Sequence, residues 1–350
     1  MKNWVYLILL FVIGCILFLN SYRPNSIYRK IIATLLIIFS GFRSDVGTDY
    51  LGYCSMFELI ARKDRYYNIE FGYYYLVKFV QLCGGTQQLV FLIMSCFTII
   101  FIYLYIENFS KNQGLSWIIY ICIGPYFLSS FNGVRQVLAV SMFAYSLKYV
   151  HNNKFWKYAL INIIGGLFHY SAFVLISFYK LLQKVELTIS KAILVYLSYC
   201  ILLALGVLGF ILTYLHATSY IIGSDLLIMD KSYNIFIVLA IACWVYYIFI
   251  ESVTKNKLRM FLNMNILSFI MVIIALTTKD ISNIVFARFN MYFFITYLIL
   301  VPNTILTIKQ PYKRKIANIL IIILCIGYYY HISLTANDLT PYHMNFMLFQ

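Results

Sequence analysis

Long uninterrupted apolar runs are the feature that most restricts how this 350-residue chain can fold. Representative runs are WVYLILLFVIGCILFL from residue 4, VFLIMSCFTIIFIYLYI from residue 90 and IANILIIILCIGYYY from residue 316. A helix of about 20 apolar residues is long enough to cross the ~30 Å hydrocarbon core of a bilayer. The sequence therefore predicts an all-α polytopic membrane protein.

The few charged residues lie mostly between the apolar runs. Only 11% of the residues are charged, yet the formal net charge is +15. Lys and Arg in short loops between membrane helices set topology and contact anionic lipid. We therefore expect membrane lipid, and not nucleic acid, to be the partner of this positive charge.

The distribution of basic residues predicts the orientation of the chain. The basic connections are residues 21–30, 148–157, 180–191, 251–259 and 309–315. The connections with little net positive charge are residues 43–72, 216–231, 277–288 and 334–350. Because basic loops stay in the cytoplasm, the second group is expected to face outward.

Two apolar segments do not fit a simple alternation of crossings. Residues 70–85 are short and contain Lys78, which favours an outer interfacial helix. Residues 157–180 have basic residues at both ends, and Gly165-Gly166 followed by Phe168-His169 interrupts them. We expect two half-helices to meet at this break and return the chain to its starting side, with His169 near the apex.

These choices predict the overall organisation. We expect about 10 to 12 transmembrane helices with one re-entrant pair, an outward-facing cavity and both termini outside. Residues 1–350 then form a single integral membrane domain, with an outward loop and interfacial helix region at 43–85.

Ionisable residues far apart in the sequence converge on the outer level of this topology. They are Arg43, Asp45, Asp49, Arg135 at the start of a helix, His169, and Arg288 at the opening of a later helix. Ionisable groups at membrane depth are costly and usually mark a site or pathway. Several arginines together indicate an anion site, although a single one is more often a lipid anchor. Alternatively, Asp45 pairs with Arg43 and His169 is a buried neutral side chain.

Three motifs in the same order resemble one family. GFRSDVGTDYLGYCSMF at 41–57 resembles the FR-x-x-x-GTDY-x-x-Y-x-x-x-F signature of EpsG-like, Wzy-type polysaccharide polymerases. Residues 133–176, from GVRQVLA to FHYSAFVLI, resemble the family's arginine-glutamine helix, basic loop and FHYSA segment. ARFNMYF at 287–293 resembles its later arginine helix.

The resemblance implies a bacterial plasma-membrane glycosyltransferase whose active site faces outward. Such enzymes transfer a growing glycan from undecaprenyl pyrophosphate to the non-reducing end of a repeat unit on the same carrier. The motif positions assign pyrophosphate binding to Arg43, Arg135 and Arg288, and substrate binding to Tyr50, Gln136 and Tyr170. Planar guanidinium groups suit phosphate oxygens.

The base that accepts the sugar hydroxyl proton is expected to be Asp49, with His169 and Asp45 as alternatives. Without a DxD motif, no metal site and no cofactor are expected. Expected partners are the lipid-linked oligosaccharide, a flippase and a chain-length regulator. A ligase of finished polymer, or a flippase or transporter of the lipid-linked unit, would share the same anion-binding residues.

Overall fold

The computed structural model describes residues 4–62, 69–123, 125–204, 252–277, 282–335 and 337–349. These residues are almost entirely helical, with one pair of two-residue strands among them. The predicted all-α class is therefore confirmed. Predicted features within residues 205–251, which include the whole connection 216–231, lie outside the described residues.

The chain divides into two compact units, residues 1–177 with 302–350, and residues 178–301. The larger unit contains α1 (Trp4–Tyr22), α2 (Ser26–Gly41), β1 (Arg43–Ser44), α3 (Tyr50–Ala61), α4 (Phe71–Leu82), α5 (Gln87–Phe109), α6 (Gln113–Cys122), α7 (Val134–His151), α8 (Phe155–Phe168), α9 (Ser171–Val174), α17 (Pro311–Thr335) and β2 (His343–Met344). The smaller unit contains α10 (Tyr179–Lys184), α11 (Ile189–Ala204), α14 (Ser252–Thr277) and α15 (Ser282–Phe294). Helix α16 (Tyr297–Ile305) crosses the boundary between the units.

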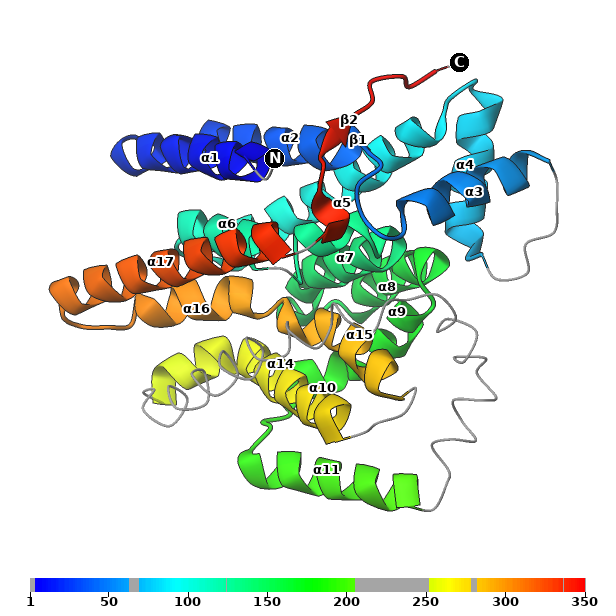
Figure 1. Cartoon of the computed structure of the whole chain (residues 1–350). Coiled ribbons are helices and arrows are strands. Elements are labelled where there is room, and N and C mark those ends of the chain that lie inside the picture. The colour runs from blue at the N-terminus through cyan, green and yellow to red at the C-terminus, as the bar shows by residue number, and fades with distance from the viewer. Residues whose placement is uncertain are drawn as a thin grey trace. The chain divides into compact units, whose positions relative to one another are not determined.

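In the larger unit, neighbouring helices pack in the order α2, α5, α7 and α8 (Figure 1). Helix α5 is apolar on all sides and half buried, which is typical of a helix that has helices on two sides within a bundle. Gly41 lets α2 approach α5 closely, because a Cβ at this position would lie 2.8 Å from Leu92 Cδ1 and 3.0 Å from Leu92 Cα.

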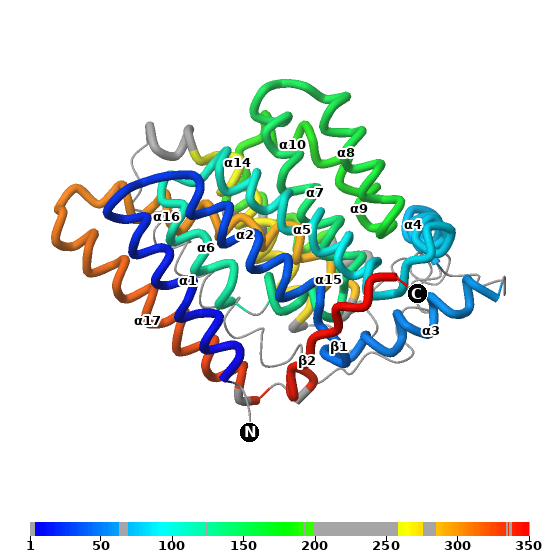
Figure 2. Tube along the Cα trace, turned by 90° about the horizontal axis from the view of Figure 1, so that it is seen from above, coloured from blue at the N-terminus to red at the C-terminus, as the bar shows by residue number. Residues whose placement is uncertain are grey.

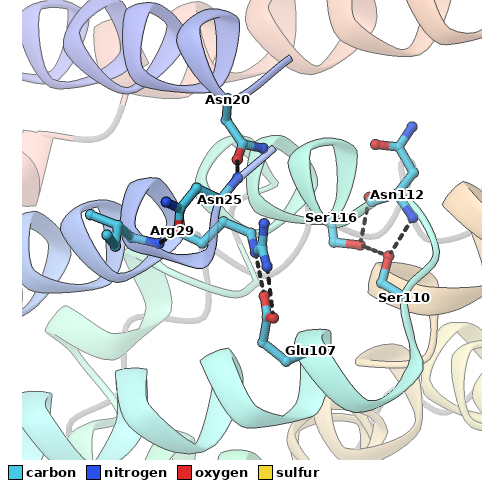
Figure 3. Close-up of polar contacts among 8 residues, drawn as sticks. Asn20, Asn25, Arg29, Glu107, Ser110, Asn112 and Ser116 are labelled. Atoms are coloured by element: carbon cyan, nitrogen blue, oxygen red, sulfur yellow. Dashed lines mark hydrogen bonds and ion pairs between the residues drawn. The ribbon is translucent and has the colours of Figure 1, made fainter. Parts of the chain in front are cut away.

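Polar contacts fix both ends of the α2–α5 pair. At one end, Gln88 Nε2 donates to the carbonyl oxygens of Gly41 (2.6 Å) and Arg43 (3.1 Å). At the other end, Arg29 and Glu107 form a two-bond ion pair (Figure 3). The helices are therefore antiparallel, and their two ends are chemically different.

Four described helices are long and apolar enough to cross a membrane: Trp4–Tyr22, Gln87–Phe109, Leu258–Ala275 and Pro311–Ser333. A fifth results if the bent pair Val285–Phe294 and Tyr297–Ile305, at 41°, is one span. The described part of the chain is thus that of a polytopic membrane protein. The 12-residue helix α4 is too short to span, since it rises only about 18 Å.

The expected break in residues 157–180 occurs at its Phe168-His169 end, with His169 at the turn as predicted, and not at Gly165-Gly166. Helix α8 continues through both glycines and ends at Phe168, and the chain turns at His169. The glycines instead allow close packing of the returning segment: a Cβ at Gly166 would lie 2.6 Å from the ring of Phe173. Tyr158 Oη donates to the carbonyl of Leu175 (2.5 Å), so the segment does run back along α8.

The segment 337–349, which follows α17, lies against the residues that follow α2. Strand β2 pairs with β1 in antiparallel register, with Arg43 opposite Met344 and Ser44 opposite His343 (Figures 1 and 2). Further along, Thr86 N donates to the carbonyl of Leu348 (2.9 Å). Two of the connections predicted to share one side of the membrane, 43–72 and 334–350, are therefore in direct contact.

Candidate functional site

Arg43 follows α2 and is almost fully enclosed by protein. Its side chain donates from Nη1 to the carbonyl of Ser40 (2.7 Å) and from Nη2 to that of Phe131 (3.1 Å). The guanidinium carbon lies 4.7 Å from the centre of the Phe91 ring and 5.1 Å from that of Phe131. With 1% of its surface exposed, Arg43 ties the end of α2 to the turn before α7.

Arg135 occupies the first turn of α7, as predicted from its motif. Its Nη1 donates to Oε2 of Glu70, and the two side chains form an ion pair. The guanidinium also lies over the rings of Tyr53 (5.7 Å) and Tyr73 (5.5 Å). The side chain of Arg135 is 15% exposed, whereas that of Glu70 is completely buried.

One aromatic cluster joins the surroundings of the two arginines. The ring of Tyr53, which faces Arg135, contacts that of Phe91, which faces Arg43, in an edge arrangement with centroids 6.0 Å apart. Tyr50 stacks on the same Phe91 ring at 5.2 Å. The structure therefore places Arg43 and Arg135 against one cluster, although they are 92 residues apart in the sequence.

The two arginines differ in how their charge is balanced. No carboxylate of a described residue lies within ion-pair distance of Arg43. Burial lowers the pKa of Arg43 to about 10, and nearby tyrosines oppose this shift, so the group stays charged at neutral pH. Burial raises the pKa of Glu70, and the charge of Arg135 opposes that shift. Positive charge is thus enclosed beside the FR-x-x-x-GTDY motif.

The motif acids are exposed and do not pair with Arg43. Asp45 adopts a positive φ of 55°, and Asp49 immediately precedes α3 without capping it. Asp45 and Asp49 are both exposed. Tyr50 is buried, and its hydroxyl lies 3.3 Å from Ser44 Oγ. The alternative in which Asp45 is the ion-pair partner of Arg43 is therefore wrong.

His169 lies at the turn between α8 and α9. Its Nδ1 is 2.6 Å from Ser171 Oγ. Phe168, the preceding residue, packs against the cluster that contains Tyr53 and Tyr73. Tyr170 is half exposed, and Gln136 is buried beside Arg135 on α7. His169 and Gln136 are thus each next in sequence to a residue that contacts the cluster, while the roles of all three motif residues stay predictions.

Arg288 belongs to the smaller unit and does not open its helix. It is the seventh residue of α15 and is partly buried there. Phe289, its neighbour, contacts Phe178 with ring centroids 6.3 Å apart. That Arg288 shares a site with Arg43 and Arg135 stays a prediction.

Two acids that the motif analysis did not select have specific partners in the larger unit. Glu70 pairs with Arg135, and Asp338 Oδ2 accepts from Asn132 Nδ2 at 3.1 Å. The scarcity of acids is the signal that could have identified them, since the whole chain has only 12 Asp and Glu residues. Groups of three or more metal-ligating side chains do not occur within the described ranges.

Comparisons with known proteins agree with the motifs. The family whose sequence model matches the chain is described as the EpsG family, and the match covers residues 26–344. This range includes Arg43, Arg135, His169, Arg288 and Asp338. The comparisons with curated proteins and with solved structures found no match.

Proposed function

Because its residues 26–344 match that family, the chain belongs to the EpsG family, and from this membership we propose that it is a polysaccharide polymerase. A general role as a membrane glycosyltransferase of polysaccharide synthesis follows from the family. The finer proposal is that the enzyme joins repeat units carried on undecaprenyl pyrophosphate. The observation that supports it is the gathering of two motif arginines around one aromatic cluster.

The proposed reaction moves a glycan between two lipid carriers. A hydroxyl at the non-reducing end of the incoming unit attacks the anomeric carbon of the growing chain. The bond from that carbon to the pyrophosphate oxygen breaks, and the pyrophosphate leaves with an additional negative charge. The hydroxyl proton passes to a base, for which Asp49 is the first candidate because this motif residue is exposed.

The arginines suit the charge that develops in this reaction. Guanidinium groups in a partly dry site stabilise a leaving pyrophosphate by bidentate contacts. Arg43 is enclosed and bonded to two carbonyls, so we assign the first contact with pyrophosphate to the partly exposed Arg135. Pyrophosphate would then compete with Glu70 for Arg135, while Arg43 supplies positive charge from behind the aromatic cluster.

The proposed function also assigns the protein a cellular location and an orientation in the membrane. We place the protein in the bacterial plasma membrane, with the Arg43 end of α2 facing outward, because the loops at the opposite end are rich in Lys and Arg. Its partners in this proposal are the lipid-linked oligosaccharide, a flippase that delivers it and a chain-length regulator.

Deletion of the gene in its native host tests the proposal, with surface polysaccharide separated on a gel. A polymerase deletion leaves single repeat units and no ladder, and the ladder returns when the wild-type gene is supplied. Loss of all surface polysaccharide, with lipid-linked units retained inside, would instead identify a flippase. Polymer that forms normally but stays on its lipid carrier would identify a ligase.

A further inference from the structure

Segment 337–349 contributes an acid to the loop that carries the GTDY motif. The backbone carbonyl of Asp338 accepts from Gly47 N at 2.8 Å, and its Oδ2 accepts from Asn132 Nδ2 at 3.1 Å. One residue therefore bonds to the motif loop and to the turn that precedes α7. These three positions are far apart in the sequence and meet only in the folded chain.

The loop has no room for a side chain at this contact. Gly47 has a φ of +96°, which L side chains rarely adopt. A Cβ there would lie 2.5 Å from Asn132 Oδ1 and 2.7 Å from the carbonyl oxygen of Phe131. Gly47 is thus held between Asn132 on one side and the Asp338 carbonyl on the other.

Each partner of Asp338 is close in sequence to a residue of the proposed reaction. Asp49 is two residues after Gly47, and Arg135 is three residues after Asn132. Asn132 does not cap α7, whose N-cap is Gly133, and the Nδ2 of Asn132 donates to Asp338. The Asp338 contacts therefore fix the exposed carboxylate and the arginine relative to each other.

Further contacts hold Asp338 in place. Strand β2 pairs with β1, which begins at Arg43, and Asn345 N donates to the carbonyl of Phe42 at 2.8 Å. Tyr342 stacks on Phe39 of α2 with ring centroids 4.3 Å apart. The segment is thus anchored to the end of α2 and to β1, where the motif loop begins (Figure 2).

We propose that Asp338 is a positioning residue, which holds the Asp49 loop against the start of α7 through its bonds to Gly47 and Asn132; this inference rests on the proposed polymerase function. A misplacement of about 1 Å in reacting groups can cost about 100-fold in rate. The role requires a hydrogen-bond acceptor in the side chain of residue 338 and does not require the negative charge of that side chain.

Four variants separate positioning from direct catalysis. Asp338→Ala removes the side-chain acceptor for Asn132 and keeps the backbone carbonyl that accepts from Gly47. It is expected to lower the maximal polymerisation rate about 10- to 100-fold, with the half-saturating substrate concentration little changed. Asp338→Asn keeps an acceptor oxygen, so its rate should fall no more than about fivefold. Asn132→Asp places a second carboxylate opposite that of Asp338 and should lower the rate. Adding Asp338→Asn should restore the rate, because residue 338 then donates the hydrogen bond and residue 132 accepts it. The control is Glu58→Ala, which changes an exposed acid on α3.

Rates are measured with full-length protein in membranes, at equal protein amounts, with the lipid-linked repeat unit as substrate. An Asp338→Asn rate as low as that of Asp338→Ala would overturn positioning and assign chemistry to the charge. Normal activity of Asp338→Ala, or no rescue in the exchanged pair, would also overturn it.

A second readout does not depend on polymerase activity. Ser44→Cys with His343→Cys, in a background without native cysteines, places two thiols at opposed strand positions that suit a disulfide. We expect Asp338→Ala to reduce disulfide formation severalfold and Asp338→Asn to preserve it. If wild-type protein forms no polymer, the proposed function fails while this readout still decides the positioning role. Equal disulfide formation in all three backgrounds would refute it.

Discussion

Arg29 and Arg43 lie near opposite ends of α2 and have different kinds of hydrogen-bond partner. Arg29 has a carboxylate partner: its Nε and Nη2 donate to Glu107 at 2.5 and 3.0 Å (Figure 3). Arg43 has two carbonyl acceptors and two flanking aromatic rings. The side chain of Arg29 is 13% exposed, whereas Arg43 is 1% exposed.

The difference indicates what each end of the helix pair does. An ion pair near the surface joins two helices at little cost and stabilises them weakly. An enclosed arginine bonded only to neutral groups retains its charge at a cost in desolvation, which a structural joint does not require. We infer that the Arg43 end is built for an anion and the Arg29 end for holding α2 to α5.

The largest effect is expected for the exposed carboxylate at the Arg43 end. Asp49→Asn should lower the polymerisation rate about 10²- to 10⁴-fold, which is the usual loss for a general base. Membrane insertion and binding of the lipid-linked unit should persist. Polymer ladders and initial rates measure the effect, with Glu58→Gln as the matched exposed acid. Normal ladders from Asp49→Asn together with none from His169→Ala would transfer the role to the histidine.

The next largest effect tests the two arginines directly. Arg43→Lys should lower the rate about 10- to 100-fold, because one ammonium group cannot span two carbonyls and lie between two rings. Arg29→Lys, which keeps its charge opposite Glu107, should change the rate less than about threefold. Initial rates in membranes with matched protein amounts compare them. Equal rates for the two variants would remove the distinction between the ends.

A smaller effect is expected on the stability of the protein, from a substitution that changes no charge. Gly47→Ala should lower the free energy of unfolding by about 1–3 kcal/mol, because residue 47 has a positive φ and no room for a Cβ. Gly52→Ala is the control, since a Cβ at that position meets nothing within 4 Å. Thermal unfolding in detergent measures both. A Gly47→Ala protein as stable as the control would show that the loop is not clamped.

The smallest effect is expected at the Arg29 end. A double-mutant cycle with Arg29→Met and Glu107→Gln should give a coupling energy of about 1 kcal/mol or less, as is typical of partly exposed pairs. Unfolding of the four proteins in detergent provides the measurement. A coupling above about 3 kcal/mol would mean that this end is as specialised as the other.

Much of the fold was predictable because its causes are local. Apolar runs predicted the helices, and the motif arginine of GVRQVLA does begin α7. The turn in 157–180 was predicted at His169, but the two glycines before it do not break the helix, because Gly166 makes room for Phe173. Whether a glycine breaks a helix or admits a neighbour depends on which segment packs against it.

The amino-acid sequence by itself determined the membrane class, the family and the motif residues, because apolar periodicity and motif spacing are properties of neighbouring residues. Only the tertiary structure decided that Glu70 is the partner of Arg135, that Arg43 has carbonyl partners, and that Asp338 reaches Gly47 and Asn132. The physical reason is that each of these contacts satisfies a buried or partly buried polar group with whichever group the packing brings near. A bond between residues 132 and 338 has no signature in either local sequence.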